Sequence, residues 1–171
     1  MKTRKSGKRS GKGAERMNPK IVDVRAVTVV GYEMSGTQEE VAALRPEWTQ
    51  RFLEAANQIP EQTDGHLMDI CLKRAGQLYT HCIAMEVNQI DIIPAGMSSL
   101  TIPPGSYAML QFHGSTEEVK YGFRSILSWA REHKVRLDAN EFRIHVTVSE
   151  AHHHLYWRLA DKRSEAIEEA V

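Results

Sequence analysis

The chain has 171 residues, with 22 basic and 22 acidic side chains and 42% hydrophobic residues. This composition is that of a globular domain and excludes a collagen-like, coiled-coil or wholly disordered chain. Because apolar runs are short and no apolar leader opens the chain, neither a membrane span nor a secretion signal is predicted. The two cysteines, Cys71 and Cys82, exclude a disulfide framework, and the sequence indicates a cytoplasmic protein.

Positive charge is concentrated at the N-terminus. Residues 1–16 carry seven basic side chains against one acidic, a net of +6, which leaves −6 on residues 17–171. With no large apolar side chain before Met17, this segment is predicted to be a disordered basic tail. The tail is either solvated or touches nucleic acid, while the acidic remainder disfavours nucleic acid as a partner. Residues 162–171 form a second charged tail, so a single domain is expected over 17–161.

In the first half, β-branched residues predict a strand over 20–34. Thr37 and Glu40 form a capping-box pattern, and apolar residues spaced by three and four predict a helix over 38–57. Pro46 is expected to break or kink its first turns, because proline has no N–H to donate. Two strands, 67–72 and 78–87, then flank a hairpin turn at Gly76 and Gln77.

The second half repeats this order of elements. A strand region over 100–112 contains a Pro-Pro-Gly interruption, a helix follows from Val119, and two strands follow at 141–148 and 155–159. Residues 36–41 resemble residues 114–119. The sequence therefore predicts an α+β fold of duplicated βαββ units, over about 20–90 and 98–160. Two antiparallel sheets would join around a central groove, with two main helices.

Two further clusters suggest chemistry only weakly. Cys71 and Cys82 are predicted to face each other across the hairpin, as inert buried thiols or, alternatively, as a redox pair. Three consecutive histidines, residues 152–154, are predicted to lie in a polar turn, and no acid or cysteine accompanies them at ligand spacing. No metal and no cofactor is therefore predicted.

The strand over 141–148 has two different faces. Four apolar residues are predicted to lie against the helices: Phe142, Ile144, Val146 and Val148. The opposite face carries Glu141, Arg143, His145 and Thr147, and it meets either the groove or solvent. In a groove, a carboxylate among aromatic rings attracts a cationic aromatic molecule. In solvent, the same carboxylate of Glu141 would form only a weak ion pair.

Several segments together resemble the GyrI-like, or AraC-type, effector-binding domains. They are residues 20–31, 84–87, 93–97, 100–108 and 114–119. The resemblance covers residues 18–161 and implies two βαββ repeats around a small-molecule pocket. It is a fold shared with SOUL-like domains and with multidrug-binding sensors of bacterial transcription regulators.

The resemblance also implies the site residues. A strand glutamate near the C-terminus contacts cationic aromatic ligands in the family, and it corresponds to Glu141. The surrounding pocket aromatics correspond to Tyr32, Trp48, Phe112 and Tyr156. Arg143 stands where the family commonly has tyrosine, so it would either neutralise Glu141 or redirect the pocket toward anionic or zwitterionic ligands.

No helix-turn-helix is predicted, so the chain resembles stand-alone members of the family. We expect a protein that senses or sequesters an amphipathic, aromatic small molecule. Two alternatives stay open. The first is a hydrolase of reactive, DNA-damaging compounds in which Glu141 acts on the bound electrophile. The second is an inhibitor or partner of a nucleic-acid enzyme. Whether the protein is an enzyme is left undecided by the sequence.

Overall fold

The computed structural model describes residues 18–161, so both predicted tails lie outside the described residues. The first half contains β1 (Lys20–Val24), β2 (Val27–Gly36), α2 (Gln38–Ala55), a 3-10 turn (Ala56–Gln58), β3 (Leu67–Ala75) and β4 (Leu78–Val87). The second half contains β5 (Ser98–Ile102), β6 (Gly105–His113), a 3-10 turn (Thr116–Glu118), α3 (Val119–Glu132), β7 (Arg143–Ser149) and β8 (His152–Arg158).

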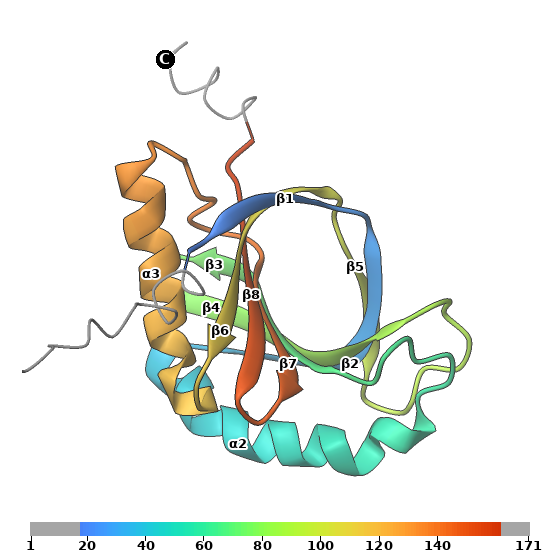
Figure 1. Ribbon diagram of the computed structural model, residues 1–171. Coiled ribbons are helices and arrows are strands. Elements are labelled where there is room, and N and C mark those ends of the chain that lie inside the picture. The colour runs from blue at the N-terminus through green and yellow to red at the C-terminus, as the bar shows by residue number, and fades with distance from the viewer. Residues whose placement is uncertain (1–17, 162–171) are drawn as a thin grey trace, which may run out of the picture.

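The eight strands form one antiparallel sheet in the order β1-β6-β8-β7-β3-β4-β2-β5. The sheet curls strongly, and both helices pack on its outer side (Figure 1). Strands β3 and β7 pair at the centre and join the two halves. The predicted α+β fold with two helices and a duplicated unit is confirmed, although the two predicted sheets are halves of a single sheet.

Each repeat is larger than predicted, because the expected strand over 20–34 is two strands separated at Arg25 and Ala26. The repeating unit is therefore ββαββ, and its first strand pairs with the other half. Strand β1 pairs with β6 of the second half, and β5 pairs with β2 of the first. This exchange makes the strand order the same when it is read from either edge, with β3 and β7 as the central pair.

The two helices begin in equivalent ways, which explains the internal sequence repeat. Thr37 and Glu40 form a reciprocal capping box at α2, and Ser115 and Glu118 form one ahead of α3. Each box satisfies backbone N–H groups that the first helical turn leaves free. The predicted break at Pro46 does not occur, since α2 continues through it to Ala55.

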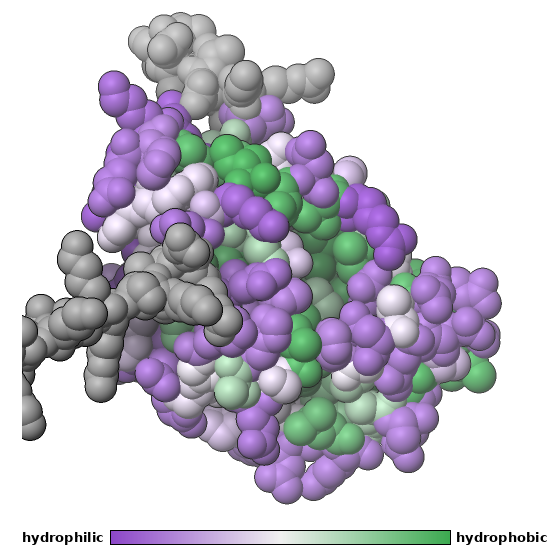
Figure 2. All heavy atoms as spheres, viewed as in Figure 1, coloured by the Kyte–Doolittle hydropathy of each residue, from purple (hydrophilic) through white to green (hydrophobic). Residues whose placement is uncertain are grey.

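Three apolar clusters hold the sheet and helices together. Phe52 and Val41 of α2 pack on β2 and β4, and Ile126 of α3 packs on β6 and β8. The third cluster fills the inside of the curl, away from both helices, and includes Ile144. In Figure 2, apolar side chains gather over the curl, with hydrophilic residues around them. The apolar face of β7 thus lies inside the curl, so the prediction that it packs against the helices is wrong.

The β3–β4 hairpin departs from its predicted register. The two-residue turn forms at Gly76 and Gln77, where Gly76 has φ of 61°. A bulge between Cys71 and Lys73 then shifts the pairing, so Cys71 faces His81 and Ile70 faces Cys82. Cys71 and Cys82 therefore point to opposite faces of the sheet, and the prediction that they face each other is wrong. None of the described helices is both long and apolar enough to cross a membrane.

Candidate functional site

A groove of about 640 Å³ lies between the two helices, on the outer face of the sheet. Its floor comes from the central strands, and its walls come from α2 and from α3 with the turn before it. The wall residues are Gln38, Val41, Ala42, Arg45, Pro46, Thr116, Glu117, Val119, Lys120, Phe123, Arg124 and Leu127. The floor residues are Asp69, Cys71, Tyr79, His81, Arg143, His145 and Trp157.

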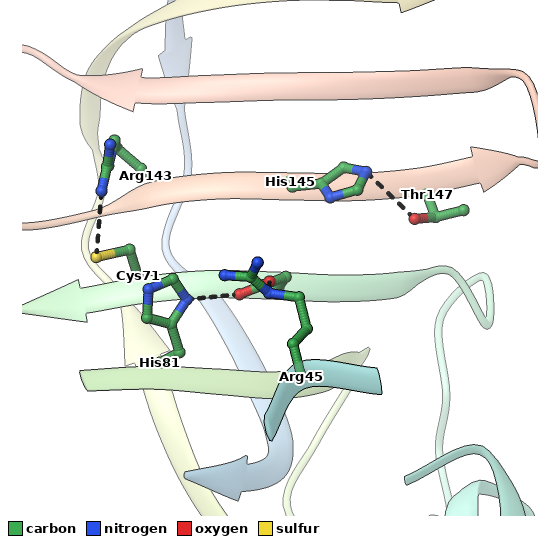
Figure 3. A network of polar contacts seen from close by, with 7 residues as sticks. Arg45, Cys71, His81, Arg143, His145 and Thr147 are labelled. Atoms are coloured by element: carbon green, nitrogen blue, oxygen red, sulfur yellow. Dashed lines mark hydrogen bonds and ion pairs between the residues drawn. The ribbon is translucent and has the colours of Figure 1, made fainter. Parts of the chain in front are cut away.

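Asp69 lies on β3 at the middle of this floor. Its Oδ2 is 2.6 Å from the Nε of Arg45, which reaches over from α2. Nδ1–H of His81, on the neighbouring strand β4, donates to Oδ1 of Asp69 at 2.8 Å. Both carboxylate oxygens are therefore in contact with cationic groups. Figure 3 shows Arg45 and His81, which come from α2 and β4, pointing toward the same place.

This contact fixes the charges of the pair. Burial raises the pKa of Asp69, but the hydrogen bond from His81 and the charge of Arg45 outweigh it, so the pKa is lowered overall. Burial lowers the pKa of His81, whereas the bond to Asp69 and the nearby Cys71 thiol raise it to about 9. At neutral pH the floor therefore holds an Asp69 carboxylate beside a His81 imidazolium.

Cys71 lies two residues along β3 from Asp69, on the same face. It pairs with His81 on one side and with Arg143 on the other. A guanidinium N–H of Arg143 points at its sulfur, with Nη2 3.9 Å from Sγ (Figure 3). The same guanidinium lies 5.1 Å from the ring centre of Trp157. Burial raises the pKa of the thiol, but His81 and Arg143 lower it overall.

A second polar chain starts at His145 of β7. Its Nε2 is 2.9 Å from Nδ1 of His153, whose Nε2 is 3.0 Å from the carbonyl of Gly114. Since a carbonyl only accepts, His153 donates to Gly114 and therefore accepts from His145. Burial and the neighbouring His153 lower the pKa of His145 to about 4, because together with the charge of Arg45 they outweigh the Asp69 carboxylate, which raises it. His145 is thus neutral at pH 7, which leaves its Nδ1 as an acceptor.

Cations outnumber carboxylates around the groove. Arg45, Lys120, Arg124 and Arg143 stand against Asp69 and Glu117. Within residues 18–161, no ion pair joins Arg143, Lys120 or Arg124 to a carboxylate. As for metals, no group of three or more His, Cys, Asp or Glu side chains in this part of the chain is placed to hold an ion.

Of the six predicted ligand-binding residues, Arg143 alone lines this groove. Tyr32 and Trp48 pack against each other beside Phe52 in the core under α2, and Phe112 is buried beneath α3. Tyr156 faces the inside of the curl. Contact between these aromatic residues and a ligand stays a prediction.

Glu141 lies in the loop before β7, with 46% of its side chain exposed and Oε2 3.4 Å from Nη1 of Arg158. The cause is Phe142, whose φ of 53° lies in the left-handed region and ends the extended conformation. The predicted alternation through Glu141 is therefore wrong by this one residue, although Arg143 and His145 do share the groove face. A ligand role for Glu141 also stays a prediction.

Sequence reasoning missed Asp69 and His81 as site residues, and it considered Cys71 and His145 without assigning either to the ligand site. A signal for one of them was present, because Asp69 is the one charged residue in the apolar run from Leu67 to Leu72. A carboxylate in such a strand needs a partner when it is buried. Its partners come from α2 and β4, so the cluster could not be read from neighbouring positions.

A concave groove that combines apolar side chains with a few converging polar groups is the usual form of a small-molecule site. The model of the Cass2 family, described as integron-associated effector binding protein, matches residues 20–159. The chain belongs to this family, and the resemblance to GyrI-like effector-binding domains is confirmed. No curated protein matches the sequence.

Solved structures share this fold at low sequence identity. The structure of SAV2435 bound to tetraphenylphosphonium has a TM-score of 0.70 at 10% identity, covering 86% of this chain and 97% of that one. The integron cassette protein from Vibrio cholerae has a TM-score of 0.66 at 10% identity, covering 83% and 95%. The EcmrR C-terminal domain has a TM-score of 0.59 at 10% identity, covering 84% and 98%.

Proposed function

We propose that this protein binds an amphipathic, aromatic small molecule in the groove between α2 and α3, and acts as a ligand sensor or sequestering protein. The observation that carries the proposal is the groove itself. Its volume of about 640 Å³ lies in the range of ligand pockets. Apolar side chains such as Phe123 and Leu127 line its walls together with charged ones, and further charged and aromatic side chains lie on the floor. The SAV2435 complex supports this assignment, since a protein of the same fold binds an aromatic ion.

The charges in this groove favour a ligand with an anionic group. Asp69, the carboxylate of the floor, already contacts Arg45 and His81, so it is a poor anchor for a cation. Arg143 offers N–H donors toward the groove without a carboxylate partner among the described residues. A guanidinium in that state favours a carboxylate or another oxyanion. This departs from the cationic ligand that the family resemblance implies.

Two probes of closely similar size and shape but opposite charge test both parts of the proposal. Thermal unfolding is followed with tetraphenylborate, an anion, and with tetraphenylphosphonium, a cation. A ligand at about 100 times its Kd stabilises a protein by about 2.7 kcal/mol, which raises Tm by several degrees. We expect the larger shift with tetraphenylborate. A larger shift with the cation would overturn the charge assignment, and no shift with either would count against binding of such molecules in the groove.

Two variants then locate the site. Arg143→Gln removes the guanidinium from the floor and is expected to reduce the shift with tetraphenylborate. Glu141→Gln tests the family-based expectation for the loop carboxylate. If the latter variant abolishes binding of tetraphenylphosphonium, Glu141 anchors cations as the resemblance implies. If both variants bind both probes as the natural chain does, the ligand lies elsewhere.

A further inference from the structure

Asp69, His81 and Cys71 follow one another across two adjacent strands and open onto the groove. His81 pairs directly with Cys71 in the β3–β4 ladder, and its Nδ1–H donates to Asp69 at 2.8 Å. The second ring nitrogen, Nε2, is thereby left on the side of Cys71, as Figure 3 shows. A carboxylate that orients an imidazole beside a thiol is the arrangement that activates a cysteine nucleophile.

Arg143 adds a second influence from the opposite strand. Its Nη2 lies 3.9 Å from Sγ of Cys71, so positive charge faces the sulfur from β7 as well as from β4. Thiolates form where cationic groups surround a partly accessible thiol. The direction of the pKa shift agrees, because His81 and Arg143 lower the pKa of Cys71 despite its burial.

Further charged side chains lie on both sides of Cys71. Arg45 of α2 lies over Asp69, and Lys120 and Arg124 face the groove from α3. On the other side, Cys71 borders a small cavity lined by Arg74 together with Asp138 and Glu141. Cations thus predominate on the groove side, from which a ligand would arrive.

Cys82 provides a contrast within the same chain. It is fully buried in the apolar cluster inside the curl, one strand away and on the opposite face. Burial, together with the charges of Glu33 and Asp69, raises the pKa of this thiol to about 12. The two cysteines therefore differ in environment although both have little exposed surface, and Cys71 alone borders the groove.

We propose that Cys71 is a nucleophile, assisted by His81 and Asp69, that captures electrophilic ligands of the groove as covalent thioethers. The electrophiles that suit this site are α,β-unsaturated carbonyl compounds that carry a carboxylate, since Arg143 would hold the anionic group. This inference deepens the proposed function and rests on it for the binding step. It departs from the expectation that both thiols are inert.

The reaction balances without any added reagent. Because His81 is already an imidazolium at neutral pH, the thiol proton of Cys71 is released to solvent. The thiolate, which lies beside the charges of His81 and Arg143, then attacks the β-carbon of the bound ligand. A carbon–sulfur bond forms while the electron pair of the carbon–carbon double bond moves toward the carbonyl oxygen. The resulting enolate takes a proton at its α-carbon from the His81 imidazolium. The product is a thioether, and the neutral His81 regains its proton from solvent.

The test uses two maleimides of similar size, N-ethylmaleimide and 3-maleimidopropionic acid, and the whole chain in its folded state. Peptide mass spectrometry measures the labelling rate of each cysteine. We expect Cys71 to react at least about 100-fold faster than Cys82, because the buried thiol reacts only when the fold opens. Relative to a neutral reference thiol, Cys71 should prefer the acidic maleimide by about tenfold. Comparable rates for the two cysteines would overturn the proposal.

Variants distinguish activation of the Cys71 thiol by His81 from simple accessibility of that thiol to the maleimide. In the natural chain the labelling rate of Cys71 should reach half its maximum below pH 9.0, which is the ordinary pKa of a cysteine thiol. His81→Gln should move that midpoint to higher pH. Cys82→Ala is the matched control and should leave the rate at Cys71 unchanged. An unaltered pH profile in His81→Gln would refute the role of the imidazole.

Failure of this inference is distinguishable from failure of the proposed function. Cys71→Ser removes the nucleophile, and thermal unfolding with tetraphenylborate reports non-covalent binding. A retained shift in this variant, together with slow labelling of the natural chain, would refute covalent capture and leave ligand binding in place.

Discussion

The pKa of His145 predicts a loss of stability in mild acid. Its folded pKa of about 4 lies below the ordinary value of 6.5, because the ring is buried beside His153 and Arg45. The folded protein therefore binds fewer protons than the unfolded chain between these two values. Unfolding takes up a proton in that window, so the contribution of His145 to stability is complete above pH 6.5 and is lost as the pH falls through 4.

The size of this effect follows from the shift. One pKa unit corresponds to about 1.4 kcal/mol, so the contribution of His145 to the free energy of unfolding should fall by about 3 kcal/mol between about pH 7 and about pH 4. Substitution of His145 by glutamine keeps a side-chain donor near Nδ1 of His153 but removes the titration. The His145→Gln variant should therefore lose stability less steeply than the natural chain across this range.

Urea unfolding at several pH values measures both proteins, and the difference between their stabilities isolates His145. Thr147→Val is the control, because it removes only the hydroxyl 3.4 Å from Nε2 of His145 and keeps the imidazole. The loss of stability in Thr147→Val should be the same at each pH. If the curves for the natural chain and His145→Gln run parallel from neutral to acid, the reasoning about this histidine is refuted.

Four further substitutions test the fold by urea unfolding at neutral pH. Gly31→Ala places a methyl group in steric overlap with the carbonyl oxygen of Ile83, so β2 and β4 must move apart and stability should fall by about 2–4 kcal/mol; an unchanged midpoint would contradict this close approach. Thr37→Ala and Ser115→Ala each remove the side-chain oxygen of a capping box and should each lower stability by about 1 kcal/mol. The control variants Thr37→Ser and Ser115→Thr keep that oxygen and should lower stability less. Glu141→Gln should change stability by less than about 1 kcal/mol, since its ion pair with Arg158 is half exposed, and a larger loss would indicate a role that this contact does not explain.

Much of the fold was predictable because its signals are local. The capping box of Thr37 and Glu40 predicts the start of α2, and the similar residues 114–119 predict the start of α3. The duplication could therefore be predicted from the sequence. The first strand of each repeat was harder, since nothing in its own residues says that β1 pairs with β6 rather than with β2. The break predicted at Pro46 also depended on long-range contacts. Packing of Val41 and Phe52 on the sheet stabilises α2 through this proline.

The candidate site depended on long-range geometry. Arg143 was found because strand alternation places it with His145, and the alternation holds up to Phe142. The position of Glu141 depended on the φ angle of that one residue, which propensity does not encode. The register of Cys71 against His81 depended on a bulge that a simple hairpin count does not anticipate. Local patterns therefore located the right strand but not the partners on its neighbours.

The exchange of first strands between the repeats has a consequence for how such a chain could arise. A single ββαββ unit leaves β2 without its edge partner, which is supplied by the other half as β5. Two identical copies of one unit could complete the same eight-stranded sheet by trading first strands, as a symmetric dimer. Their central contact would be a strand paired with its own symmetry mate, where β3 now meets β7. Once one chain carries both units, those two strands are free to diverge. The groove can then place Asp69 and Cys71 on one side of the former symmetry axis and Arg143 and His145 on the other, an asymmetry that a dimer of identical chains could not have.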